Sequence, residues 1–330
     1  MSQVVKASDL TEQDKKMLFW GSFLALAAAG TGFAFRLTKG GEYGSDFALT
    51  FQEVGQIMGA SFWPIAVTMI LFSLLVDRTG YKRPMYVAFA LQAVSGVMAF
   101  TATSYEGLYY AAICAGLGHG IVEAVINPIC AAVYPKDKTK RLTILHAAWP
   151  AGVAGGALAI LGADYVADLT WKWHALWIVL PAAAYAVMYR PCTFPVDERV
   201  QAGVPYMVML KQVGFLSATL ASVLLVYELG NALGFKTALG DALGLAPENW
   251  LQTSMIVGGA MGVVFGLSVR SVGKPLFFLM CCLMMPVATA ELSTDAFIQP
   301  LMKPVLEDMQ INPTFAIVFS MTIMLILRVF

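Results

Sequence analysis

Charged side chains are scarce in this chain: they make up 13% of its 330 residues, whereas hydrophobic residues make up 58%. A soluble globular protein carries roughly a quarter charged residues. The composition therefore excludes an ordinary soluble domain and predicts an integral membrane protein. Neither sign of charge predominates, since 21 Lys and Arg balance 21 Asp and Glu. Because these charges are spread among short polar segments and form no basic face, a nucleic-acid partner is not expected.

Cysteine is too sparse to build a disulfide framework. The chain has five cysteines and no C-x-x-C pair, and four of them fall in apolar runs, so we interpret them as small apolar fillers. Neither a disulfide scaffold nor a cofactor is predicted. The opening residues, "MSQVVKASDLTEQDKK", lack the basic-then-apolar layout of a cleaved signal peptide. The first apolar segment is therefore expected to be retained.

Long hydrophobic runs, in contrast, are abundant. A helix needs roughly 20 mainly apolar residues to cross the hydrocarbon of a membrane. Ten segments meet this criterion: 17–35, 54–76, 84–103, 107–133, 142–162, 171–189, 213–233, 251–269, 275–293 and 313–330. The predicted fold class is therefore an all-α polytopic membrane protein.

These segments suggest a division of the chain into three parts. We expect an amino-terminal six-helix bundle over residues 1–199, a connecting segment with two additional helices over 200–273, and the start of a second bundle over 274–330. Because the chain stops at "MTIMLILRVF", still within an apolar run, we expect this second bundle to be incomplete.

The distribution of basic residues predicts the orientation, because Lys and Arg favour cytoplasmic loops. With the amino terminus inside, the inside segments hold 16 of the 21 Lys and Arg residues. The outside segments hold the other five, namely Arg36, Lys39, Lys172, Lys236 and Lys303. We therefore expect an integral protein of the plasma (inner) membrane with a cytoplasmic amino terminus.

A motif lies in the predicted cytoplasmic turn between the second and third spans, where residues 73–83 read "SLLVDRTGYKR". Gly80 permits a tight turn with positive φ, and the basic residues favour the cytoplasmic face. The stretch resembles the signature of the major facilitator superfamily, G-x-x-x-D-[RK]-x-G-[RK]-[RK]. The residues that fit are Asp77, Arg78, Gly80, Lys82 and Arg83, whereas Ser73 and Tyr81 depart from it.

The resemblance to this superfamily implies a major-facilitator-type helical bundle. It also implies that Asp77 holds a neighbouring helix end and latches a cytoplasmic gate. The alternative interpretation is a basic turn that only obeys the positive-inside rule.

A polar stripe interrupts the fourth span at "GHGIVEAVINP". His119, Glu123 and Asn127 are four residues apart, so on an α-helix they lie on one face. A charged group at membrane depth costs several kcal/mol, so this face is expected to line the bundle interior or a water-filled cavity. Pro128 removes a backbone donor and permits a kink. Asn127 serves equally well as glue between helices, and His119 as a packed side chain, whereas Glu123 is the candidate for carrying a proton.

The next span sharpens this hypothesis. His146 and Trp149 lie three residues apart in "LTILHAAWPAG", at the start of span five. Together with "VEAVINP", this stretch resembles the fucose–proton symporter branch of the superfamily. The resemblance implies that Glu123 takes part in proton coupling and substrate binding. Thr143 stands where that branch has an asparagine, and the first span lacks the acid that the branch uses there.

Further candidates lie elsewhere in the membrane segments. Glu291, near the end of the ninth span, would face the outer part of a central cavity or a solvated helix end. Two pairs of glycines with the small-x-x-x-small spacing, Gly116 with Gly120 and Gly152 with Gly156, are expected to let spans four and five approach each other.

The functional hypothesis is a secondary transporter that works by alternating access. Its partners would be a small polar solute such as a sugar, together with protons and the lipid bilayer, and we expect a monomer. One alternative is an intramembrane enzyme in which His119, Glu123 and His146 bind a metal or act as acid and base, although no H-E-x-x-H or G-x-S-x-G motif is present. Another is a solute sensor derived from a transporter.

Overall fold

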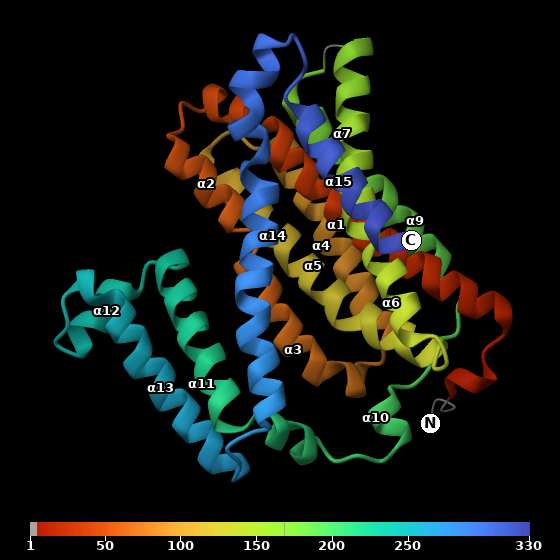
Figure 1. Ribbon diagram of the computed structural model, residues 1–330, viewed down its shortest axis with the longest axis vertical. Coiled ribbons are helices and arrows are strands. Elements are labelled where there is room, and N and C mark those ends of the chain that lie inside the picture. Colours follow the sequence, from red (N-terminus) through yellow and green to blue (C-terminus); the bar gives the residue numbers. More distant parts are fainter. Residues whose placement is uncertain (1–4, 168) are drawn as a thin grey trace. The chain divides into compact units, whose positions relative to one another are not determined.

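The computed structural model of the protein describes residues 5–167 and 169–330 (Figure 1). Regular structure in these residues is helical, with no strand, which confirms the all-α fold class. The chain forms two compact units, Met1–Gln201 with Asp295–Phe330, and Ala202–Thr294. One long helix, α14 (Pro275–Asp308), contributes residues to both. The division into a six-helix bundle, a connecting segment and an incomplete second bundle stays a prediction.

The first unit is a bundle of long helices joined by short turns. It contains η1 (Ala7–Asp9), α1 (Glu12–Asp46), α2 (Phe51–Gly59), α3 (Trp63–Thr79), α4 (Lys82–Thr101), α5 (Tyr105–Val133), α6 (Lys138–His146), α7 (Ala148–Ala167), α8 (Trp171–His174), η2 (Ala175–Ile178), α9 (Val179–Tyr189), α10 (Glu198–Gln201), the end of α14 and α15 (Thr314–Val329). Side-chain caps mark several helix starts: Thr11 accepts from the amide of Asp14, and Thr50 and Glu53 form a reciprocal capping box at α2.

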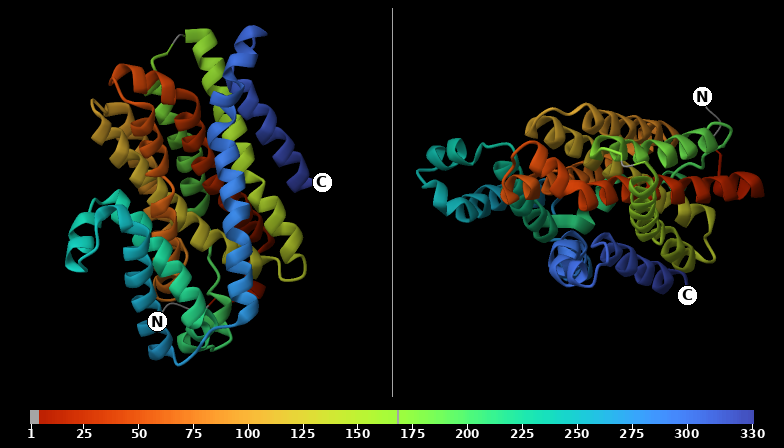
Figure 2. Two further views of the ribbon diagram at one scale, coloured as in Figure 1. Left: turned by 60° about the vertical axis from the view of Figure 1, so that its left-hand side comes forward. Right: turned by 90° about the horizontal axis from the view of Figure 1, so that it is seen from above.

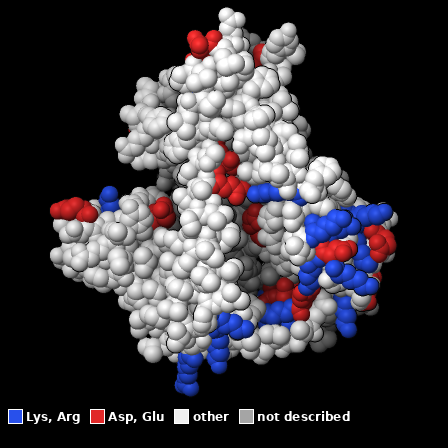
Figure 3. Space-filling view, in the orientation of Figure 1, with Lys and Arg blue, Asp and Glu red and all other residues white. Residues whose placement is uncertain are grey.

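Helix α1 lies at the centre of this bundle and packs against α5, α7 and α9. Its middle is built from small residues and is buried from Ala25 to Gly30, which lets neighbouring helices approach closely. Helix α15 packs along α7 (Figure 2). In Figure 3 uncharged side chains cover most of the visible surface, and Lys and Arg gather over the start of α1 and around α6. This surface is typical of a bundle surrounded by lipid, with charges at its ends.

Most of the predicted spans correspond to long helices. Eight segments in the described part of the chain are long and apolar enough to cross a membrane, and they coincide with eight of the ten predicted spans. The predicted span at 171–189 is instead divided among α8, η2 and α9, and that at 313–330 is the 16-residue helix α15.

The first span is longer than the sequence suggested. We expected it to end at residue 35, with Arg36 and Lys39 in an outside segment, but α1 continues to Asp46. The helix can include Lys39 because its ammonium group binds the carboxylates of Glu42 at 2.6 Å and Asp164 at 2.8 Å. Tertiary ion pairs thus override the local polarity of the sequence.

The small-residue pairs do not join spans four and five as expected. Gly116 and Gly120 of α5 lie against the start of α3, at Pro64 and Ile65, and Gly152 of α7 lies against Ala27 of α1. Each pair removes side chains where two backbones meet, but the partner helices are α3 and α1. The spacing predicted close packing and could not identify the partner.

Two glycines of α7 allow a direct test of this packing. An alanine Cβ at position 152 would collide with the backbone of Ala27, whereas one at position 155 would meet nothing within 4 Å. We expect Gly152→Ala to lower the free energy of unfolding by about 1–3 kcal/mol. Gly155→Ala, the matched control, should be neutral or stabilising, since alanine favours helices. Thermal unfolding in detergent would measure both, and equal stabilities of the two variants would contradict this packing.

The second unit consists of α11 (Tyr206–Ala232), α12 (Lys236–Ala242), η3 (Pro247–Asn249), α13 (Trp250–Val269) and the first part of α14. Helix α11 is kinked at Gly214, whose φ of 55° and ψ of −164° are not helical. Beyond the kink, α11 packs closely on α13, where Gly258 and Gly262 meet Val223 and Thr219. The kink separates the short opening of α11 from its membrane-length part.

Candidate functional site

The polar stripe of span four lies on α5, and its three side chains contact one another in series. His119 Nε2 lies 3.6 Å from one carboxylate oxygen of Glu123. The other oxygen accepts a hydrogen bond of 3.0 Å from Asn127 Nδ2. The side chains of His119 and Glu123 are only 14% and 17% exposed. The carboxylate of Glu123 therefore lies largely shielded from solvent between a histidine and an amide.

His146, the last residue of α6, extends this series to a second helix. Its Nε2 lies 2.9 Å from Asn127 Oδ1. On its other side Asn127 faces both the backbone carbonyl and the carboxylate of Glu123, each at 3.0 Å. A backbone carbonyl only accepts hydrogen bonds, so the amide nitrogen of Asn127 must face Glu123 and its oxygen must face His146. His146 Nε2 consequently carries a proton and donates a hydrogen bond to Asn127 Oδ1.

Trp149 completes the group from the first turn of α7. Its ring stacks on that of His119, with centroids 4.9 Å apart and planes inclined by 13°. The backbone carbonyl of His146 accepts a hydrogen bond of 2.8 Å from Arg328 of α15. We call His119, Glu123, Asn127, His146 and Trp149 the α5 cluster. His119 and Asn127 thus contact Glu123 directly, and Trp149 and His146 contact those two residues in turn.

A narrow hollow adjoins the cluster on the side of His119 and Trp149. Its other walls are mostly apolar side chains of α1, α3 and α5, but Arg36 of α1 also lines it. The sequence predicted Arg36 in an outside segment, but α1 extends to Asp46 and thereby places it in this wall.

Two other sequence candidates lie outside the α5 cluster. Glu291 lies on α14 within the second unit and is partly buried, and its role stays a prediction. Thr143, at the position of the symporter-branch asparagine, is exposed and donates to the carbonyl of Thr139 in its own helix.

The motif between spans two and three forms a second polar centre. Gly80 ends α3 with a φ of 69°, and its amide donates to the carbonyl of Val76 at 2.8 Å. Asp77, with a side chain only 6% exposed, pairs with Arg199 of the short helix α10, whose Nε donates to it over 3.0 Å. The partner of Asp77 is therefore the guanidinium of Arg199. The end of a neighbouring helix, α9, is instead bound by Lys82, whose ammonium donates to the carbonyls of Arg190 and Cys192.

Tyr81, the position that departs from the motif, joins the same centre. Its hydroxyl donates a hydrogen bond of 2.6 Å to Asp197, and the amide of Arg199 donates to the other oxygen of that carboxylate over 2.8 Å. Burial and this hydrogen bond raise the pKa of Tyr81 well above its ordinary value. The hydroxyl therefore stays protonated and keeps donating. Arg78 and Arg83, the remaining motif residues, are exposed.

The pair of Asp77 and Arg199 allows a double-mutant test. We expect Asp77→Asn and Arg199→Gln each to destabilise the protein, because each leaves a partly buried charge unpaired. In a cycle with the double variant, the coupling energy should be about 1–3 kcal/mol. The exposed pair of Lys303 and Glu307, 3.7 Å apart, is the control and should show about 0.5 kcal/mol or less. Equal coupling for the two pairs in thermal unfolding measurements would argue against a latch at Asp77.

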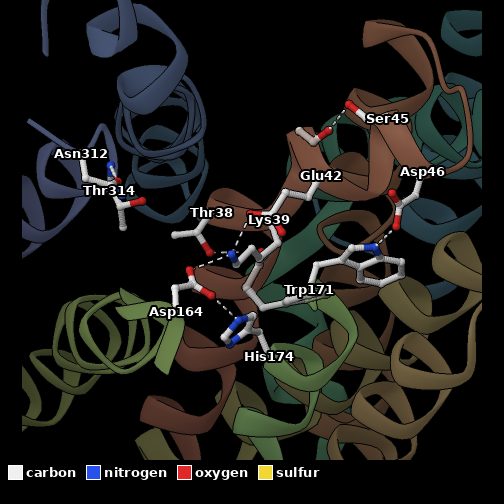
Figure 4. Close-up of polar contacts among 12 residues, drawn as sticks. Thr38, Lys39, Glu42, Ser45, Asp46, Asp164, Trp171, His174, Asn312 and Thr314 are labelled. Atoms are coloured by element: carbon white, nitrogen blue, oxygen red, sulfur yellow. Dashed lines mark hydrogen bonds and ion pairs between the residues drawn. The ribbon is translucent and has the colours of Figure 1, made fainter. Parts of the chain in front are cut away.

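A third polar centre, which our interpretation of the sequence missed, connects α1, α7 and α8 (Figure 4). Asp164 accepts from Lys39 at 2.8 Å through one oxygen and contacts His174 Nε2 at 2.7 Å through the other. The second ring nitrogen of His174 accepts from the indole of Trp177 at 3.2 Å. That hydrogen bond fixes the proton of His174 on Nε2, so the histidine donates to Asp164. Lys39 and His174, both buried, thereby have hydrogen-bond partners.

The arrangement of the ligand-type side chains in these centres can be compared with that of a metal site. In the part of the chain that the structure describes, no group of three or more His, Cys, Asp or Glu side chains is arranged to hold a metal ion. The groups of the α5 cluster have chemistry of their own. The carboxylate of Glu123 can bind or release a proton, and the imidazoles of His119 and His146 can donate hydrogen bonds. The amide of Asn127 connects Glu123 to His146.

Comparison with known proteins points to one family. Residues 17–327 match the family model described as Major Facilitator Superfamily. None of the curated proteins compared with the chain matches it. Among solved structures, the crystal structure of a D-xylose-proton symporter is similar, with a TM-score of 0.49 and 15% identity over 74% of this chain. The chain spans 65% of the length of that protein.

Proposed function

This chain belongs to the Major Facilitator Superfamily, and from that premise we propose that it is a secondary active transporter that moves a sugar-sized polar solute together with protons. The observation that supports this most directly is the shielded carboxylate of Glu123, held between His119 and Asn127. An ionisable side chain at membrane depth is costly and is kept for proton or substrate pathways.

In the proposed mechanism, proton binding changes the contacts of Glu123. The ionised carboxylate attracts His119 and accepts from Asn127. Protonation removes the charge, weakens both contacts and releases these groups to bind solute. The bundle would then favour the conformation in which the carboxylate faces the opposite side. Alternating access follows if the two conformations differ in affinity for the proton and the solute.

The orientation and the gate belong to the same proposal. Because 16 of the 21 basic residues fall in the predicted inside segments, we place the amino terminus in the cytoplasm and the protein in the plasma (inner) membrane. Asp77 and Arg199 would then latch the cytoplasmic side, and breaking this pair would accompany opening there. We propose that one chain suffices for transport.

Uptake by purified protein in proteoliposomes tests the function. The labelled probes are L-fucose, D-xylose, sorbitol and gluconate, each offered with and without an external pH one unit lower than the internal pH. We expect the gradient to drive accumulation of at least one probe and a protonophore to abolish it. Uptake that is equal with and without the gradient would exclude proton coupling. Binding of a probe without any flux would favour a sensor.

A further inference from the structure

Arg36 is a partly buried cation without a counter-ion. Its Nε atom is inaccessible to solvent and has no hydrogen-bond partner. Its guanidinium lies 5.9 Å from the ring of Phe33, and no carboxylate in the described chain forms an ion pair with it. Lys39, one turn later on α1, is paired with two carboxylates. The fold thus pairs Lys39 with carboxylates and gives Arg36 no such partner.

A second unsatisfied group lies beside Arg36. The hydroxyl of Tyr43 is fully buried and has no hydrogen-bond partner. Tyr43 and Arg36 line one hollow, whose other walls are apolar apart from Ser95, and the hydroxyl of Ser95 already donates to the carbonyl of Gln92. Two groups able to donate therefore line one hollow, and neither the Arg36 Nε nor the Tyr43 hydroxyl has an acceptor there. Such an arrangement suits a ligand that supplies oxygen acceptors and negative charge.

Arg36 also connects this hollow to the α5 cluster. It lines the second hollow together with His119 and Trp149. Each hollow has room for about one water molecule, so in this conformation the space suits a small ligand group and not a whole solute. A guanidinium binds a carboxylate or a phosphate with two parallel hydrogen bonds, and the planar carboxylate is the smaller of the two, which makes it the better match to hollows of this size.

We propose that the transported solute carries a carboxylate and that Arg36, assisted by Tyr43, binds it. This inference rests on the proposed transport function and specifies its substrate class. The remainder of the solute extends toward His119 and Trp149. The carboxylate of the solute provides the negative charge that Arg36 lacks in the fold. A solute without this group therefore binds less tightly.

Matched pairs of solutes test the inference. The pairs are gluconate with sorbitol, glucuronate with glucose, and lactate with 1,2-propanediol, each differing in a carboxylate. Thermal stabilisation of the detergent-solubilised protein and uptake in proteoliposomes give two readouts. We expect at least one carboxylate to bind about tenfold more tightly than its neutral partner. Arg36→Gln should remove this preference, Arg36→Lys should retain part of it, and Tyr43→Phe should weaken it severalfold. The exposed Arg190 supplies the control variant Arg190→Gln, which should behave as wild type.

Stability distinguishes a binding role from a structural one. Because an unpaired charge that is partly removed from solvent is unfavourable, Arg36→Gln should unfold at the same temperature as the wild type or a higher one, even though it has lost carboxylate binding. Loss of folding in Arg36→Gln would overturn the inference in favour of a structural role. It would also be overturned if no carboxylate bound, or if chloride stabilised the protein as well as gluconate did. Proton-driven uptake of L-fucose or D-xylose in that case would leave the transport function standing.

Discussion

Glu123→Gln is expected to abolish proton-driven accumulation of the solute and to preserve its exchange across the membrane. Glutamine has the shape of a protonated glutamate and still offers an oxygen to Asn127 Nδ2, which now lies 3.0 Å from the carboxylate. It cannot bind or release a proton. With one proton per solute, a gradient of one pH unit supports roughly tenfold accumulation, since about 1.4 kcal/mol corresponds to a factor of ten. The variant should therefore fall to an accumulation ratio near one.

The control for this variant is Glu106→Gln. Glu106 lies in the first turn of the same helix and is exposed, so its neutralisation should leave accumulation at the wild-type level. Exchange of labelled for unlabelled solute, measured without a pH gradient, shows whether Glu123→Gln still binds and translocates. A Glu123→Gln variant that accumulates solute like the wild type would remove Glu123 from the coupling mechanism.

Local spacing was sufficient to predict the fold class and the composition of the polar stripe. Residues four apart on a helix share a face regardless of what surrounds it, and the structure has His119, Glu123 and Asn127 on one face of α5, in contact. The positions of the long helices followed from hydrophobic runs for the same reason, because the length and polarity of a span are properties of a continuous segment.

Long-range partners could not be predicted in this way. Lys39 meets Asp164 across 125 positions of the sequence, and Arg199 meets Asp77 across 122. Because the sequence does not show that Asp164 pairs with Lys39, the polar stretch after residue 35 predicted the end of a span. This placed Arg36 outside the bundle and concealed its proximity to His119. The error in one boundary thus removed a cation from the candidate site.

The ion pair of Lys39 and Asp164 leads to the second large expected effect. Asp164→Ala should destabilise the protein by about 3 kcal/mol, the lower end for breaking a buried ion pair, since the side chain of Asp164 is 34% exposed and that of Lys39 only 6%. The loss leaves His174 Nε2 without its acceptor and Lys39 with Glu42 alone. Asp308→Ala, at an exposed position, is the control and should change stability by about 0.5 kcal/mol or less.

A double variant separates the ionic contribution from packing in this network. Lys39→Met combined with Asp164→Leu replaces both charges by apolar side chains, and such replacements of buried pairs are often neutral. We expect it to recover much of the stability lost in Asp164→Ala, although His174 still lacks an acceptor. Thermal unfolding of the four proteins gives the comparison. If Asp164→Ala unfolds like the wild type, α1 is held in place beyond residue 35 by its packing alone. In that case the helical position of Arg36 does not depend on Lys39.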